Sequence, residues 1–184
     1  MPETAIRSQK PMNKDTNRLL EVVGLAKSYC ELCESALEFS REEFIDRTLD
    51  LLPRIYWNFF DLSLGVSLDE TEYFSDYVDE TLYGQIESTI SGIMGGADTF
   101  LETFEEDMKY SDTPITSSIS ECLADIFQPL FNFISIVHDS DGTQLEEAFI
   151  NCKEDFESYW SQTLCNVLKA LNNIKYNRSE EDLV

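Results

Sequence analysis

The sequence predicts an all-α protein, an up-and-down bundle of about five or six helices. The main reason is the stretch from Pro114 to His138, whose apolar side chains would cover roughly two-thirds of a helix circumference at about 100° per residue. A surface helix has a wide polar face, whereas this stretch has only a narrow polar stripe. We therefore expect it to be surrounded by other helices, near the centre of the bundle.

Two further observations support this fold class. No stretch alternates apolar and polar residues for long enough to predict a strand, and the chain has no internal repeat. From about Gln144 to Ile174 the apolar residues recur at alternating spacings of three and four, which is typical of bundle packing: Leu145, Phe149, Cys152, Phe156, Trp160, Leu164, Val167, Leu171 and Ile174.

Helix signals also mark the first half of the chain. A first helix, capped by Asn13 or Asp15, carries apolar residues at helical spacing: Leu19, Val22, Val23, Ala26, Cys30, Cys33 and Leu37. A second begins at Ser40, which forms a Ser-x-x-Glu capping box with Glu43, and Pro53 inside it should kink or split it. The segment 63–72 lacks periodicity and is the main predicted loop.

Two helices are expected between this loop and the central helix. A third helix, marked by Leu82, Ile86, Ile90 and Ile93, ends at Gly95-Gly96. A short fourth helix runs from Ala97 to about Met108 and exposes an acidic face to solvent: Asp98, Glu102, Glu105 and Glu106.

The start of the central helix has two interpretations. Either Thr113 is its N-cap and Pro114 its first residue, or the regular helix starts later with Ser118 and Glu121 as a capping box. Inside this helix Pro129 removes one backbone hydrogen bond and leaves the carbonyl of Asp125 without its usual amide partner.

The length of 184 residues is most simply one domain. We expect a flexible N-terminus over residues 1–11, a single helical-bundle domain over residues 12–176, and an acidic flexible tail over residues 177–184.

The charge of the chain is unusual, with 36 acidic against 13 basic residues and a formal net charge of −23. Such a surface repels nucleic acids and anionic membranes and favours a basic protein partner or a divalent cation, although it can also serve solubility alone. The chain has no apolar signal-peptide region and no membrane span, and its five cysteines are an odd number. These features together predict a cytoplasmic protein with reduced thiols.

The candidate binding site is the polar stripe of the central helix, which comprises Glu121, Asp125, Gln128 and Asn132. Carboxylates four residues apart can share a divalent cation or position a water, and a pocket there is expected to open near Pro129. The structural alternative is that Glu121 belongs to a cap, and that Asp125 and Gln128 satisfy nearby backbone groups.

Other motifs predict no chemistry. The single histidine, His138, has Ser135 rather than glutamate three residues before it, which excludes the Glu-x-x-His pairs of di-iron bundles. Cys30 and Cys33 have CxxC spacing but lie on an apolar face, which favours core packing. The segment from Asp139 to Gly142 does not continue as a calcium-binding loop.

Short motifs add a resemblance to a known family. The segments Ser120–Gln128 (SECLADIFQ), Tyr110–Ile115 (YSDTPI) and Leu52–Tyr56 (LPRIY) resemble an uncharacterised bacterial family of small all-helical proteins catalogued as a domain of unknown function. The resemblance spans roughly Val23 to Leu171 and implies a bacterial, cytoplasmic, all-helical protein, without a reaction or cofactor. The family pattern favours tyrosine and aspartate where this chain has Phe127 and Pro129, so a ligand held by those positions would not be expected here.

The sequence therefore supports two functional hypotheses. The first is a non-enzymatic interaction or regulatory protein without a cofactor, because no catalytic motif is assembled and the surface charge is strong. The alternative is a divalent-metal-dependent hydrolase that uses the carboxylates of Glu121 and Asp125. The sequence predicts neither a substrate nor an oligomeric state.

Overall fold

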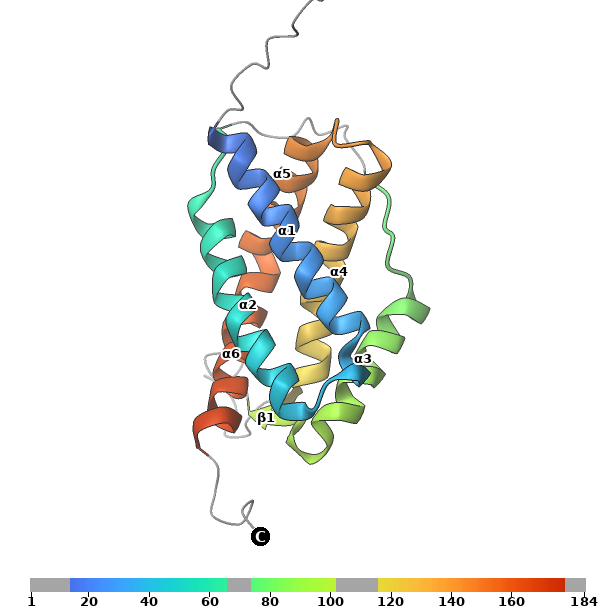
Figure 1. The fold of residues 1–184 in the computed structure, drawn as a ribbon, viewed down its shortest axis with the longest axis vertical. Coiled ribbons are helices and arrows are strands. Elements are labelled where there is room, and N and C mark those ends of the chain that lie inside the picture. Colours follow the sequence, from blue (N-terminus) through green and yellow to red (C-terminus); the bar gives the residue numbers. More distant parts are fainter. Residues whose placement is uncertain (1–13, 66–73, 102–115, 178–184) are drawn as a thin grey trace, which may run out of the picture.

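The computed structural model describes residues 14–65, 74–101 and 116–177, and it confirms the all-α bundle (Figure 1). Its elements, in chain order, are α1 (Lys14–Glu34), the short 3₁₀ helix η1 (Ala36–Glu38), α2 (Arg41–Asp61), α3 (Glu80–Met94), the 3₁₀ turn η2 (Gly95–Ala97), β1 (Thr99–Leu101), β2 (Thr116–Ser118), α4 (Ile119–Asp139), α5 (Leu145–Asp155), the π-helical segment η4 (Phe156–Trp160) and α6 (Ser161–Tyr176).

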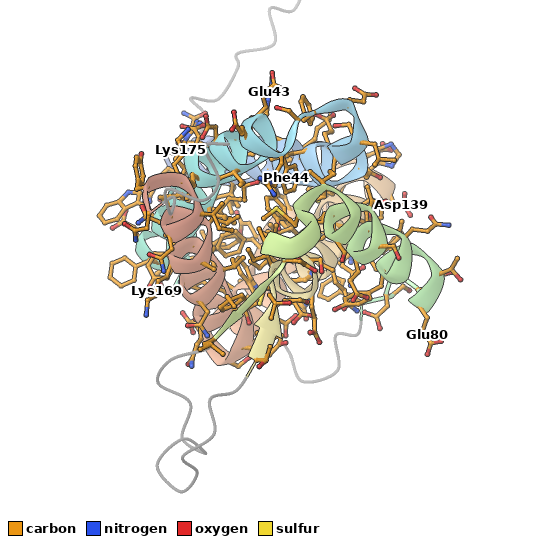
Figure 2. The ribbon with its side chains drawn as sticks, turned by 90° about the horizontal axis from the view of Figure 1, so that it is seen from below. Glu43, Phe44, Glu80, Asp139, Lys169 and Lys175 are labelled. Carbon is orange, nitrogen blue, oxygen red and sulfur yellow. The ribbon has the colours of Figure 1, made fainter. Side chains whose placement is uncertain are left out.

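The central position predicted for the most apolar helix is confirmed. Helix α4 contacts α1, α3, α5 and α6, and most of its apolar side chains from Ile119 to Ile136 are buried. Tyr29 of α1 donates a buried hydrogen bond of 2.9 Å to the carbonyl of Leu123 and so ties α1 to α4. Viewed along the bundle, side chains such as Phe44 fill the centre, whereas Glu43 and Glu80 point outward (Figure 2).

Helix α2 begins as its sequence predicts. Ser40 is the N-cap, its hydroxyl accepts a hydrogen bond from the backbone N–H of Glu43, and the Glu43 carboxylate accepts one from the backbone N–H of Ser40. This is the predicted capping box. Pro53 does not split the helix, which runs without interruption to Asp61.

Helix α4 begins at Ile119, which settles the two interpretations of its start. Residues 116–118 form strand β2 directly before the helix, so the helix does not extend back through them, and Thr113 and Pro114 lie outside the described residues. Ser118 is the N-cap instead, and its hydroxyl accepts a 3.2 Å hydrogen bond from the backbone N–H of Glu121. The side chain of Glu121 is exposed.

The predicted fourth helix from Ala97 to Met108 is wrong at its start. After the turn at Gly95–Ala97, strand β1 pairs antiparallel with β2, with Thr99 opposite Ser118 and Leu101 opposite Thr116. The sequence predicted no strands, and the β1–β2 pair shows that this prediction is wrong. Asp98 lies between the turn and β1 and bonds the start of α4, so it does not belong to a solvated helix face. Glu102, Glu105 and Glu106 lie outside the described residues.

The last predicted helix is continuous from Leu145 to Tyr176 through α5, η4 and α6. The π-helical turn keeps Phe156 and Trp160 in the core, where both contact Phe59 of α2. A π turn inserts an extra residue into a helix, and such insertions often occur at functional sites.

Other predictions meet the structure as follows. Leu37 is 75% exposed and does not continue the apolar face of the first helix, because α1 ends at Glu34. Four of the five cysteines are buried and unbridged, whereas Cys165 is free and exposed.

None of the described helices is long and apolar enough to cross a lipid bilayer. The predicted flexible segment 1–11 and nearly all of the tail 177–184 lie outside the described residues, so the domain boundaries stay a prediction.

Candidate functional site: an anionic pocket between α4 and α6

A pocket of about 490 Å³ lies along α4 where the stripe begins. Glu121 and Asp125 of α4 form one side, and Tyr159 of the π-helical segment lies opposite with Gln162 and Asn166 of α6. The pocket thus contains two residues of the predicted stripe together with side chains that the sequence analysis did not predict at this site.

The Asp125 carboxylate is fixed by two tyrosines from different helices. Tyr83 of α3 donates a 2.8 Å hydrogen bond to Oδ1, and Tyr159 donates a 2.7 Å hydrogen bond to Oδ2. Each carboxylate oxygen has two lone pairs, so both oxygens can still accept a hydrogen bond from a ligand. Asp125 is half-buried, and we interpret it as a positioned acceptor at the wall of the pocket.

Both tyrosines stay protonated near neutral pH. Partial burial, followed by the hydrogen bond to Asp125, raises the pKa of Tyr159 to about 12. The same two causes, in the same order, raise the pKa of Tyr83. The hydroxyls therefore remain donors over the physiological range, and Asp125 remains their acceptor.

Among the residues that the structure describes, no lysine or arginine lines this pocket. Between Arg54 and Lys153 the sequence contains a single basic residue of either kind, Lys109, which lies outside the described residues. Helices α3 and α4 therefore carry acidic residues and, like the β1–β2 pair, no lysine or arginine. This scarcity of basic residues is visible in the sequence, and among the described residues no lysine or arginine lies in the pocket beside Asp125.

The rest of the stripe lies away from this pocket. Asn132 accepts hydrogen bonds from the backbone N–H groups of Tyr77 and Val78, at 2.8 and 3.3 Å, and donates one to Asp76. It thereby holds the segment that leads into α3, in a smaller cavity of about 220 Å³ that Pro129 also lines. Gln128 is half-buried and lines neither cavity. The structure thus places Pro129 beside Asn132, whereas a pocket containing Asp125 had been expected to open there.

A divalent cation has little support from the described part of the chain. It contains no group of three or more histidine, cysteine, aspartate or glutamate residues that could hold a metal ion. Glu121 and Asp125 would supply only two carboxylates to such an ion.

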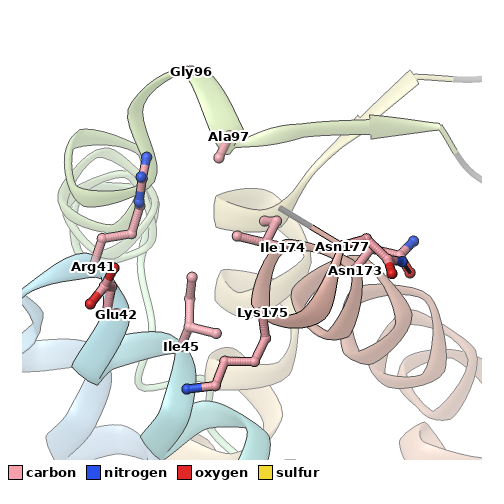
Figure 3. Close-up of a pocket in the computed structure, with 9 residues that line it drawn as sticks. All are labelled: Arg41, Glu42, Ile45, Gly96, Ala97, Asn173, Ile174, Lys175 and Asn177. Atoms are coloured by element: carbon pink, nitrogen blue, oxygen red, sulfur yellow. Dashed lines mark hydrogen bonds between the residues drawn. The ribbon is translucent and has the colours of Figure 1, made fainter. Parts of the chain in front are cut away.

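A larger cavity of about 750 Å³ lies between the start of α2 and the end of α6 (Figure 3). Ile45 and Ile174 give it an apolar side, and Gly96 and Ala97 lie above them in the view. Its charged groups are of both signs, and Lys175 is paired with Asp46. We assign no ligand class to this cavity.

Comparisons with known proteins support the fold and add no activity. A family model described as Domain of unknown function (DUF5063) matches residues 13–177. The crystal structure of protein BF1032 from Bacteroides fragilis, a structural genomics target, is 28% identical in sequence, with a TM-score of 0.76 over 91% of this chain and 96% of that chain. No curated protein matches the chain.

Proposed function

The chain belongs to the family described as Domain of unknown function (DUF5063), and for this member we propose a non-enzymatic binding function. The bundle takes a cationic side chain of a basic partner protein into the pocket beside Glu121 and Asp125. The observation that carries the proposal is the Asp125 carboxylate, which two tyrosines hold in place in a pocket whose described lining contains no lysine or arginine.

The chemistry of the pocket suits a guanidinium or ammonium group. Such a group carries only hydrogen-bond donors, and Asp125 and Glu121 are acceptors on neighbouring turns of α4. Tyr159 is 59% exposed, so its ring offers a face for a cation–π contact beside the same carboxylate. Because the tyrosine bonds already fix Asp125, little ordering is needed when a cation binds.

The surrounding charge supports the same partner class. An excess of negative charge over α3 and α4 attracts cationic proteins over several ångströms and accelerates encounter. The alternative, a metal-dependent hydrolase, would need ligands from outside the described residues, and no observation on the described residues favours it.

The test measures binding of a deca-arginine peptide by calorimetry at low salt, for the wild type and for Glu121→Gln/Asp125→Asn. A charge-matched control, Glu38→Gln/Asp141→Asn, removes two exposed carboxylates outside the pocket. We expect the pocket variant to bind about tenfold more weakly than the control, and binding to weaken as salt rises. Equal affinities for the two variants would mean that only net charge matters, which would overturn the proposal.

A further inference from the structure

Three aromatic side chains on the C-terminal half of α2 form an exposed patch, which we call the Trp57 patch: Tyr56, Trp57 and Phe60. Trp57 is 59% exposed and Phe60 is 62% exposed. Their ring centroids are 6.1 Å apart, and Tyr56 stacks on Phe60 at 6.3 Å. Tryptophan and other aromatic residues are enriched at the energetic centres of protein interfaces, which makes this patch a candidate contact surface.

The patch and the anionic pocket flank the same π-helical segment. The ring of Tyr56 contacts that of Phe156 edge to face at 5.4 Å, and Phe156 is the first residue of η4. Ser158 and Tyr159, two and three residues later, line the pocket. A polypeptide that crosses η4 can therefore contact the patch on one side and the pocket on the other.

Two basic residues close to the patch, Arg54 in sequence and Lys153 in space, are already paired with acidic groups. Arg54 pairs with Asp50 at 3.2 Å, and Lys153 lies 3.1 Å from the Glu157 carboxylate and donates to the carbonyl of Phe59. Neither of these two cations is unpaired beside the aromatic rings, and the chain has a net charge of −23. This charge opposes docking of a second copy of the chain and favours a cationic partner.

We infer that the partner segment is arginine-rich and extended, and that it crosses η4 with one arginine in the pocket and another on the Trp57 patch. The inference rests on the proposed function and narrows its partner class. Arginine fits better than lysine, because its planar guanidinium stacks on aromatic faces and is more weakly hydrated.

Tryptophan fluorescence gives a direct readout. The structure places Trp57 at the surface and Trp160 in the core, 1% exposed, so acrylamide quenching reports mainly on Trp57. We expect deca-arginine to reduce quenching of the wild type, and Trp57→Phe to lose this protection. Trp57→Ser and Phe60→Ser should each weaken deca-arginine binding several-fold and affect deca-lysine less. The matched control is Tyr176→Ser, which removes an exposed aromatic ring at the end of α6 and should change neither affinity.

The outcomes separate this inference from the proposed function. If Glu121→Gln/Asp125→Asn binds deca-arginine more weakly while both patch variants bind it with wild-type affinity, the Trp57 patch is not part of the site. That result would overturn the inference. If wild-type protein does not bind deca-arginine, both proposals fail together. If Trp57→Ser instead changes the molar mass in solution, the patch is a contact between copies, which also overturns the inference. Circular dichroism melts of the patch variants should match the wild type, because both side chains are exposed.

Discussion

Asp98 and Ser120 form a paired hydrogen bond that fixes where α4 begins. The backbone N–H of Ser120 donates to Oδ1 of Asp98 and its hydroxyl donates to Oδ2, both at 2.8 Å. The N–H of Ile119 also donates to the Asp98 carbonyl at 2.7 Å. A residue outside the helix therefore satisfies N–H groups of its first turn, which have no partners within the helix.

Replacing Asp98 by alanine should lower the free energy of unfolding by about 1–3 kcal/mol, because buried donors of Ser120 would lose their acceptor. The matched aspartate variant is Asp50→Ala, which removes only an exposed ion pair with Arg54 and should cost about 0.5 kcal/mol or less. Urea titrations of both variants measure the difference. Equal losses would show that the bonds to Ser120 do not support the helix.

Introducing a charge into the centre of α4 should unfold the protein. Ile126 is fully buried, and an unpaired carboxylate there costs several kcal/mol against a total stability of about 5–15 kcal/mol. The control is His138→Asp, which introduces the same group at an exposed position of the same helix and should leave a cooperative melt. A cooperative thermal transition of Ile126→Asp near the wild-type midpoint would contradict the central position of α4.

The thiols should differ sharply in reactivity. Burial raises the pKa of Cys33 to about 12 and also raises the pKa values of Cys30 and Cys152, which disfavours their reactive thiolate forms. We expect the native protein to react rapidly with one equivalent of Ellman's reagent, at the exposed Cys165, and the denatured protein with five. Cys165→Ser should abolish the rapid phase. Only three reactive thiols in the denatured protein would reveal a disulfide.

Stability should fall at alkaline pH. The pKa of Tyr159 is about 12 in the folded protein against an ordinary value of 10, so the folded state holds this proton more tightly than the unfolded chain does. The resulting stabilisation is present below pH 10 and is lost as the pH rises toward 12. Melting temperatures of the wild type and Tyr159→Phe over this range measure the effect, and the variant should show a smaller decline. Parallel curves would contradict the raised pKa.

Asp125→Asn should lower the free energy of unfolding by about 1–3 kcal/mol, because Asp125 accepts hydrogen bonds from two tyrosines that asparagine cannot satisfy as well. Millimolar Mn²⁺ should change the stability of neither protein, since the described residues form no metal cluster there. Denaturant titrations with and without Mn²⁺ test both statements. Stabilisation of the wild type alone by Mn²⁺ would support the metal-binding alternative instead.

The features that the sequence predicted well are local or periodic. The Ser40–Glu43 capping box spans one helical turn, so its partners are known from spacing alone. The burial of α4 follows from an apolar surface too wide for any exposed helix, and the continuous last helix follows from its regular apolar spacing. Glu121 and Asp125 line the same pocket for a related reason, because residues four apart share a helix face.

The features that the sequence missed depend on residues brought together by packing. Asp98 caps a helix that begins 21 residues later in the chain, and the β1–β2 pair forms between three-residue segments whose local pattern does not require strands. Tyr83 and Tyr159 reach Asp125 from 42 and 34 residues away. The sequence by itself therefore determined most of the helices and their buried faces, through interactions within a helical turn. Only the tertiary structure decided where α4 starts and which side chains complete the pocket, because those contacts exist only once the helices have packed.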